Sequence, residues 1–453
     1  IDISFALLAL AIVARYLGTR DFGRYAFIVA VGSLITPLVD MGLRRIVIRE
    51  MAKDLDNAAK YLGSALFLRG VATVFLVLAS IILILLSGSE TINLIVLVVL
   101  STIASAYEMV FTGVLNAFER MEYEIMITAS RKLLHLVLLL LVVFMDLKLV
   151  GIIMVMLVSN VIGASFGYLI SRKKFIVSKL KVSWNRCIAL LKEAYPLGIY
   201  AFILVLFYRI DIFFLKYYRD IYEIGLYQAG SQFILMGNII PMALVSSLFP
   251  LLSRFADMDK DRFTSVYKKT FLYLMILGLT IVLIILCLAE NIVLLVYGRD
   301  FLDASSAMRI LVWALLMVFF NILLSTILTA VNRQVFNAVA AAACLSINIL
   351  MDIILIPTYG YIGACYATLI SFLVLFFMTF YFVERFVVSI NLMNLVWKPF
   401  ISVMVPIFLF TIVKGSTVLF VIPFLTIYFV LLFWFKAIST DDVLHFKRIF
   451  MRG

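Results

Sequence analysis

The sequence predicts an all-α polytopic membrane protein of about 14 transmembrane helices, with two pseudo-symmetric six-helix bundles followed by two C-terminal helices. Composition is the first reason: 65% of the 453 residues are hydrophobic and 14% are charged, whereas soluble domains carry about 25% charged residues. Apolar runs of about 17 to 25 residues, long enough to cross a bilayer as helices, are the second reason. An internal repeat is the third. Continuous apolar runs also exclude a membrane barrel, whose strands alternate in hydrophobicity.

Fourteen apolar runs are the candidate spans. They begin near Ile1, Gly23, Gly63, Ile92, Tyr123, Lys148, Tyr195, Gly225, Lys269, Ala307, Phe336, Tyr361, Pro399 and Thr417. The first run is short, because only residues 3–14 are uninterrupted before Arg15, and the chain does not begin with Met. We therefore expect the first helix to be truncated and further residues to precede Ile1.

Basic residues are distributed unequally between alternate loops. If the N-terminus is cytoplasmic, 25 of the 38 Lys and Arg residues fall on the cytoplasmic side and nine on the outside. Because positive residues accumulate on the cytoplasmic side, we expect a multi-pass protein of the plasma or inner membrane with both termini in the cytoplasm. The same pattern accounts for the net charge of +12 and argues against a nucleic-acid partner.

The internal repeat determines the predicted domains. Residues 21–25 (DFGRY) resemble residues 223–227 (EIGLY), and residues 115–123 (LNAFERMEY) resemble residues 328–336 (LTAVNRQVF). The repeat unit then holds six helices, an even number, so both copies enter the membrane in the same direction. The predicted parts are an N-terminal bundle (1–171), a basic cytoplasmic linker (172–193), a C-terminal bundle (194–385), and two additional helices with a cytoplasmic tail (386–453).

The sequence contains no motif typical of a metal site or of catalysis. Its four cysteines are scattered without a CxxC pair, and His135 and His445 are its only histidines. This pattern predicts neither a metal site nor a disulfide framework. No carboxylate pair or nucleophile has catalytic spacing, so the sequence predicts neither a cofactor nor the active site of an enzyme.

Several segments resemble the Wzx-type oligosaccharide flippases of polysaccharide biosynthesis. They are ARYLG at 14–18 with DFGRY at 21–25, PLVDMGL at 37–43, REMA at 49–52, RID at 209–211 with GLY at 225–227, and NILMDIILIPTYGYIGA at 348–364. The resemblance covers essentially the whole chain. This family belongs to the multidrug/oligosaccharidyl-lipid/polysaccharide exporter superfamily, together with multidrug and toxin extrusion antiporters and the lipid II flippase.

The resemblance implies transport of a polyprenyl-diphosphate-linked oligosaccharide from the cytoplasmic to the outer leaflet by alternating access, for cell-surface polysaccharide or glycan assembly. Sugar hydroxyls and a diphosphate cannot cross hydrocarbon without polar partners, so we expect a polar cavity between the bundles while the polyprenyl tail stays in membrane lipid. A polysaccharide polymerase or a glycosyltransferase would be a partner. Two alternatives stay open: a MATE-like drug or cation antiporter, and a polytopic polysaccharide polymerase or glycosyltransferase.

Three arginines inside the predicted spans, Arg69, Arg131 and Arg209, are the candidate substrate-binding residues. A charge at the bilayer centre costs roughly 2.5 to 3.5 kcal/mol and suggests a function by default, and the guanidinium plane suits a diphosphate. Arg69 and Arg131 lie about 12 Å inside the cytoplasmic ends of their spans. Glu108 is expected to pair with either of them, beside an inner-leaflet diphosphate site.

Three carboxylates, Glu108, Asp211 and Asp352, are candidates for gating or ion coupling. Arg209 and Asp211 are two positions apart, so their side chains leave a helix on nearly opposite faces. Asp352 and Arg209 lie at similar depth in the outer half of the membrane. We therefore expect a salt bridge between Asp352 and Arg209, with Arg209 as an exit-side or gating residue.

Two further polar residues are expected to be structural. Asp40 lies one turn before Arg44 near the cytoplasmic end of the second span, where the two residues would pair at a helix end. His135 lies one turn after Arg131 and is expected to be a hydrogen-bonded packing residue.

Overall fold

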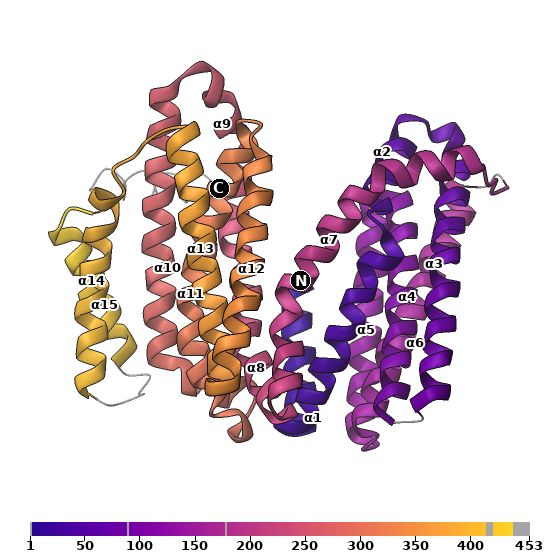
Figure 1. Ribbon diagram of the computed structural model, residues 1–453, viewed down its shortest axis with the longest axis horizontal. Coiled ribbons are helices and arrows are strands. Elements are labelled where there is room, and N and C mark those ends of the chain that lie inside the picture. The colour runs from indigo at the N-terminus through magenta and orange to yellow at the C-terminus, as the bar shows by residue number, and fades with distance from the viewer. Residues whose placement is uncertain (1, 88–89, 177–178, 414–419, 438–453) are drawn as a thin grey trace. The chain divides into compact units, whose positions relative to one another are not determined.

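The computed structural model describes residues 2–87, 90–176, 179–413 and 420–437 (Figure 1). These residues form helices and connecting turns, and no strand occurs among them. The first helices are α1 (Asp2–Asp40), α2 (Leu43–Lys53), α3 (Ala58–Ser87), α4 (Glu90–Ala117), α5 (Met121–Phe144), α6 (Lys148–Ile170) and α7 (Trp184–Tyr218). They are followed by α8 (Ile221–Gly237), α9 (Ile239–Met258), α10 (Lys260–Val296), α11 (Ala304–Ala330), α12 (Gln334–Tyr359), α13 (Tyr361–Phe386), α14 (Leu392–Val413) and α15 (Val421–Trp434).

The helices confirm the predicted all-α membrane fold. Among the described residues, 12 segments are long and apolar enough to cross a membrane, and Val421–Trp434 is a shorter apolar helix. The first segment, Phe5–Lys53, contains two predicted spans, because Gly18 (φ 69, ψ 173) interrupts the helical path of α1. The predicted start of the last span, Thr417, and the predicted tail after residue 437 lie outside the described residues.

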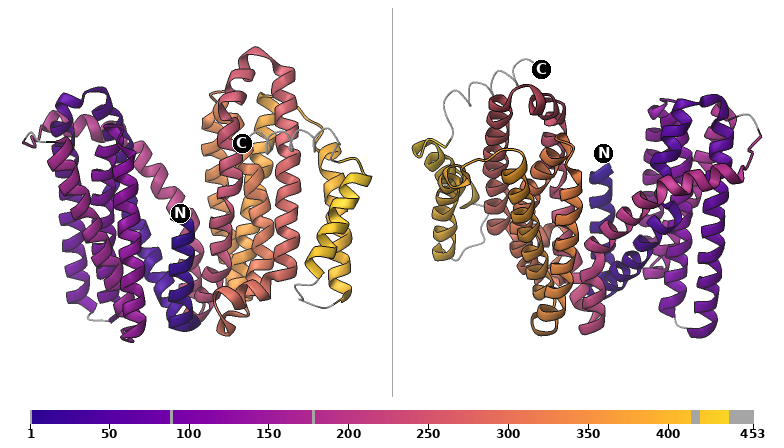
Figure 2. Two further views of the ribbon diagram at one scale, coloured as in Figure 1. Left: turned by 180° about the vertical axis from the view of Figure 1, so that it is seen from behind. Right: turned by 45° about the horizontal axis from the view of Figure 1, so that its top comes forward.

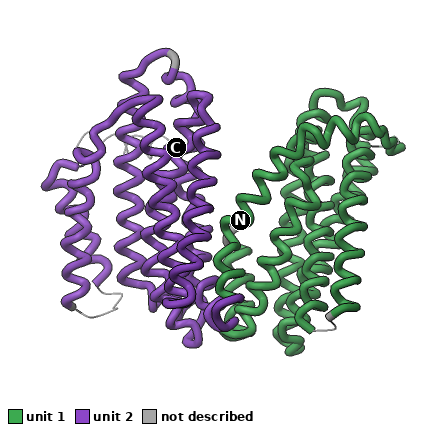
Figure 3. The backbone as a smooth tube through the Cα atoms, in the orientation of Figure 1, with its two compact units in different colours: residues 1–216 green, residues 217–453 purple. Residues whose placement is uncertain are grey.

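The chain divides into two compact units, residues 1–216 and residues 217–453 (Figure 3). Each unit is a bundle of helices, which can be followed from different sides in Figure 2. The division falls near the end of α7, so the segment predicted as a linker, 172–193, groups with the first unit. The limits of the two six-helix repeats remain a prediction.

The first half of α7 is packed against the first unit. Cys187, Leu190 and Ala194 are buried in an apolar cluster with side chains of α2 and α3. A Cβ at Gly42 (φ 74) would lie 2.5 Å from the carbonyl oxygen of Ala194 and 2.7 Å from the amide nitrogen of Gly198. Glycine at position 42 therefore allows the left-handed turn between α1 and α2 and the close contact with α7.

The internal repeat is visible in the turns of the two units. The turn between α4 and α5 passes through Glu119 (φ 57), and the turn between α11 and α12 passes through Asn332 (φ 58). In each turn the next amide, of Arg120 or Arg333, donates to the carbonyl five residues earlier, at 2.9 and 2.7 Å. The matched sequences 115–123 and 328–336 therefore fold into the same type of helix-ending turn.

Helix packing repeats in the same order. In the first unit α4 packs against α1, α3 and α6, and α5 packs against α6. In the second unit α11 packs against α8, α10 and α13, and α12 packs against α13. The central helices α4 and α11 therefore occupy equivalent positions in their units, as a parallel repeat requires. The additional helices α14 and α15 pack against each other and against α10.

Candidate functional site

Arg69 of α3 lies inside the first unit, with 1% of its surface exposed. Its guanidinium donates to the Asp40 carboxylate and to the backbone carbonyl of Ala106 on α4. A buried cation without such partners costs several kcal/mol, so Asp40 explains how Arg69 is accommodated. The prediction that Asp40 pairs with Arg44 is wrong, because the chain turns at Gly42 and Arg44 lies in the first turn of a new helix instead of one turn farther along α1.

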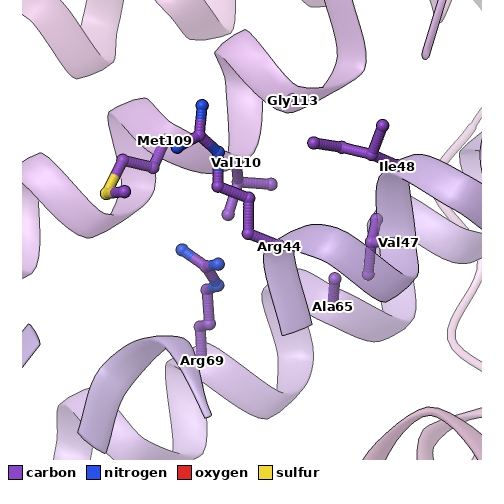
Figure 4. A pocket seen from close by; sticks show the side chains of 8 residues that line it. All are labelled: Arg44, Val47, Ile48, Ala65, Arg69, Met109, Val110 and Gly113. Carbon is purple, nitrogen blue, oxygen red and sulfur yellow. The ribbon is translucent and has the colours of Figure 1, made fainter. Parts of the chain in front are cut away.

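Arg44 and Arg69 line the same small cavity between α2, α3 and α4 (Figure 4). The cavity measures about 10 Å³, roughly the space of one water molecule. Nη2 of Arg44 lies 3.4 Å from Oε1 of Glu124 on α5, and 31% of the Arg44 side chain is exposed. The buried Nε atoms of both arginines lack a hydrogen-bond partner among the described residues. Two cations therefore line one interior space, and each has one unused donor.

Arg131 belongs to a different polar cluster. Its Nε lies 3.0 Å from the Glu108 carboxylate of α4, and its Nη1 donates to Oδ1 of Asn160 on α6 at 3.1 Å. The Asn160 amide in turn donates to Oγ of Ser101 at 2.9 Å. A Cβ at Gly163 would lie 2.6 Å from both Cδ of Arg131 and Oε2 of Glu108. Glycine at position 163 therefore leaves the room that this ion pair occupies.

The two arginine clusters use different acids and different helices. Glu108 pairs with Arg131, as one of the two predicted pairings requires, whereas Arg69 pairs with Asp40. Arg69 thus contacts α4 from α3, and Arg131 contacts α4 from α5. The two arginines do not share one carboxylate. His135 is hydrogen-bonded as expected, with Nδ1 3.0 Å from a serine hydroxyl of α6.

The candidates predicted for the outer half of the membrane lie in different units. Arg209 and Asp211 are on α7 within residues 1–216, and Asp352 is on α12 in the second unit. The salt bridge between Arg209 and Asp352 therefore stays a prediction. Asp211 is 4% exposed and Asp352 is fully buried, with the buried Asn348 one helical turn before it. Two intramembrane carboxylates thus lie away from bulk water, one in each unit.

Asn348 and Asp352 lie on the face of α12 that packs against α13. On this face Sγ of Cys344 donates to the carbonyl of Ser371 at 3.2 Å, and a Cβ at Gly363 would lie 2.3 Å from the α12 backbone. Asp352 falls between these two contacts along α12, so its carboxylate lies at a close helix interface. No group of three His, Cys, Asp or Glu residues that would hold a metal is found in the part of the chain that the structure describes.

Sequence reasoning missed the position of Arg44, which it placed one turn after Asp40 at the end of the second span. The usable signal was the glycine at position 42 followed by Leu43, Ile46, Val47 and Met51, an apolar pattern with helical spacing. These four residues are buried in α2. The pattern predicts a short amphipathic helix lying on the unit, which brings Arg44 next to the interior.

The fold defines the class of protein. The structure matches the lipid II flippase MurJ, in an inward closed conformation, with a TM-score of 0.78 and 15% identity over 97% of both chains. It also matches an inward-facing multidrug resistance MATE family transporter of the MOP superfamily, with a TM-score of 0.69 and 15% identity over 85% of this chain and 95% of that chain. The chain is thus a polytopic membrane protein with the fold of this superfamily.

Sequence comparison narrows the class to one family. The family model described as polysaccharide biosynthesis protein matches residues 3–256, and the MatE model matches residues 196–354. The chain belongs to the polysaccharide biosynthesis protein family, as its motifs predict.

Two relatives are similar over most of this chain. The probable low-salt glycan biosynthesis flippase Agl15 of Haloferax volcanii is 23% identical over 81% of this chain and 77% of its own. The capsular polysaccharide biosynthesis protein CapF of Staphylococcus aureus is 21% identical over 83% of this chain and 94% of its own.

Proposed function

We propose that the protein is a flippase that moves a polyprenyl-diphosphate-linked oligosaccharide from the cytoplasmic to the outer leaflet. Its family and the names of its relatives Agl15 and CapF support a role in surface glycan assembly. The observation that carries the proposal is the pair Arg44 and Arg69 on one interior cavity. A diphosphate is the anionic part of such a substrate, and arginine binds phosphate oxygens through paired, charge-assisted hydrogen bonds.

The two arginines have different roles in this proposal. Arg69 is fixed by Asp40 and a backbone carbonyl, so it supplies a permanent positive charge. Arg44 makes only a 3.4 Å contact with Glu124 and is partly exposed, so a phosphate oxygen can replace this carboxylate. At about 10 Å³ the cavity is smaller than a diphosphate. Substrate binding therefore requires α2 to move away from α3 and α4, the helices that line the cavity with it, and such a movement would couple binding to the alternating-access change.

The remaining charges have proposed roles away from this cavity. Arg131 contributes to the cationic inner half while Glu108 holds its guanidinium in place. Arg209 acts on the exit side, and Asp211 and Asp352 take part in gating or ion coupling, which their burial supports. A substrate of charge −2 leaving a cytoplasm that is 100 mV negative gains roughly 4.6 kcal/mol. The membrane potential is therefore large enough to drive export without a coupled ion.

The proposal includes a location and partners. The protein lies in the plasma or inner membrane with both termini in the cytoplasm, which the distribution of basic residues supports. A glycosyltransferase would supply its substrate on the inner leaflet, and a polysaccharide polymerase or a second transferase would use it on the outer leaflet.

Reconstitution tests the proposal. Purified protein is placed in liposomes that contain a polyprenyl-diphosphate oligosaccharide with a fluorescent sugar, and a membrane-impermeant quencher reports the sugars in the outer leaflet. In protein-free liposomes, the label on the inner leaflet stays protected from the quencher. We expect the protein to move this label to the outer leaflet, where it is quenched. If the label is protected equally in liposomes with and without the protein, and the protein is confirmed to be in the membrane, the proposal is contradicted.

A drug or cation antiporter is a second function of the same fold. It would favour carboxylates that are available in the cavity, whereas Asp40 and Glu124 are each engaged by an arginine. Dye efflux in intact cells without lipid-linked sugar transport would support the antiporter. Polymerised or transferred sugar made by the pure protein would instead identify a polymerase or glycosyltransferase.

A further inference from the structure

A second, larger cavity lies at the end of the first unit where the start of α7 passes α2 and α3. It measures about 620 Å³, and its wall includes Glu50, Tyr61, Arg186, Ala189 and Lys192. This volume is within the range of small-molecule sites, roughly 300 to 1,000 Å³. The cavity shares no lining residue with the Arg44 and Arg69 cavity. It is therefore a separate site.

The acids in the wall are already neutralised. Glu50 accepts hydrogen bonds from Arg49 at 2.8 Å and from Lys53 at 2.9 Å. Glu193 accepts one from Arg49 at 2.5 Å. No ion pair within the described ranges engages the two basic residues of the wall. The wall therefore presents two uncompensated positive charges.

The guanidinium of Arg186 has a fixed position and an unused donor. It lies over the ring of Tyr61, 4.5 Å from the ring centroid, and this stacking holds its plane. Its Nη1 is shielded from solvent, and no described residue accepts a hydrogen bond from it. Arg186 lines the cavity and keeps an unused donor, and a phosphate oxygen is a strong acceptor for a guanidinium. Lys192 supplies a second, exposed cation on the same wall.

The surroundings place this cavity at the depth of lipid headgroups. Trp184, the first residue of α7, is 66% exposed, and its ring packs edge-on against Phe67 at 6.5 Å. Phe67 is itself exposed on the apolar helix α3, and tryptophan is enriched at membrane interfaces. Tyr61 lies six residues before Phe67, about 9 Å along the helix axis. The cavity thus begins where the apolar surface of α3 ends.

We propose that this cavity binds a phosphate ester, held by Arg186 and Lys192, and that its occupant is the headgroup of an anionic glycerophospholipid. The second source of the same chemistry is the diphosphate of a lipid-linked sugar. Glu50 and Glu193 are paired with Arg49 and Lys53, so the two cations of the wall are available to a phosphate ester, and the headgroup depth of the cavity favours the phosphodiester of a phospholipid. The proposal does not depend on the protein being a flippase.

Native mass spectrometry of the full-length protein tests the site. The detergent-solubilised protein is offered phosphatidylglycerol and phosphatidylcholine at equal concentrations, and the retained lipids are counted. We expect retention of phosphatidylglycerol, and an approximately tenfold loss of affinity when Arg186→Gln and Lys192→Gln are combined. Ala189→Trp should abolish retention by filling the cavity at unchanged charge. Lys268→Gln with Lys269→Gln, on an exposed part of α10, is the matched control and should retain the lipid.

Three results would overturn the proposal. Phosphatidylglycerol retained equally by the Arg186 and Lys192 double variant and by Ala189→Trp would show that lipid binds elsewhere. Retention of phosphatidylcholine equal to that of phosphatidylglycerol would show that the site does not select its lipid by charge. Displacement of phosphatidylglycerol by inorganic pyrophosphate would assign the site to a diphosphate. If the double variant does not fold, Arg186→Lys keeps the charge but loses the planar stacking on Tyr61, and an intermediate affinity is expected.

Discussion

Arg69 and Arg131 show two ways in which the first unit accommodates a charge inside an apolar bundle. Arg69 is fully buried and uses a carboxylate and a backbone carbonyl. Arg131 is partly exposed and uses a carboxylate and an amide side chain. Burying an ion pair is close to neutral in free energy, but removing one partner leaves an uncompensated charge. The partners Asp40 and Glu108 are therefore as important for folding as the arginines.

The first prediction concerns Arg69 and Asp40. Arg69→Met should destabilise the protein by about 3 to 5 kcal/mol, because it leaves Asp40 without its cation. Combining it with Asp40→Leu should restore much of this loss, since no buried charge remains. Thermal unfolding in detergent measures both variants. If the double variant is less stable than Arg69→Met, the pair does not have the role that we assign to it.

The second prediction concerns the space next to Arg131. Gly163→Val should destabilise the protein by about 1 to 3 kcal/mol, because the new side chain overlaps the ion pair. Ser165→Val, at an exposed position of the same helix, is the control and should have little effect. In a Glu108→Ala background the cost of Gly163→Val should fall, because space is freed. An equal cost in both backgrounds would place the clash elsewhere.

At this scale, sequence reasoning found the arginines but only some of their partners. Arg69 and Arg131 are recognisable because a charge within an apolar run is conspicuous. Glu108 was identified because it falls at a matching depth in a neighbouring span. Asp40 was assigned to Arg44, since the turn at Gly42 is hidden in a pattern that reads as one continuous helix. Side-chain partners depend on which helices pack together, which hydrophobicity alone does not determine.

Helix ends decide much of the fold at the level of elements. The apolar runs predicted the long helices, because length and hydrophobicity are sufficient for a span. The short helix α2 was not predicted as a separate element, since the sequence around Gly42 reads as a continuation of the preceding span. It is nevertheless the element that brings Arg44 to the interior. The turn at Gly42 and the contact with α7 fix its direction.

The third prediction compares the equivalent turns at Glu119 and Asn332. Both residues have positive φ, which glycine adopts without strain and asparagine more readily than glutamate. Glu119→Gly should therefore stabilise the protein by up to about 1 kcal/mol, and Asn332→Gly should have a smaller effect. Unfolding midpoints of the two variants test this order. A loss of stability in Glu119→Gly would contradict the turn geometry.

At the scale of the whole molecule, the internal repeat makes parts of the two units structurally equivalent. Its existence was predicted from two short sequence matches, and the second match corresponds to equal turns and equal helix packing. The division near residue 216 was not predicted. The basic segment before α7 resembles a linker, whereas the apolar face of Cys187, Leu190 and Ala194 attaches α7 to the first unit. A linker and a packed helix start differ in tertiary contacts rather than in composition.

The fourth prediction concerns orientation in the membrane. Cysteines introduced at Met145, in the turn after α5, and at Met258, the last residue of α9, are both at exposed positions, and the basic residues assign these positions to opposite sides. A membrane-impermeant maleimide should label Met145→Cys in intact cells, and Met258→Cys only after permeabilisation. The four native cysteines are buried, so the background should be low. The reverse labelling pattern would invert the orientation and the proposed direction of transport.

The most direct test of the central claim compares Arg44 with its neighbour Arg45 in the liposome assay. Arg45 is exposed on the same helix, so Arg44→Gln and Arg45→Gln remove the same charge from the inside and the outside of the unit. We expect Arg44→Gln to slow translocation of the lipid-linked sugar by about tenfold or more, the loss of one charge-assisted contact, and Arg45→Gln to leave the rate close to that of the unchanged protein. Equal rates for the two variants, at equal stability and incorporation, would contradict a diphosphate site at Arg44 and Arg69.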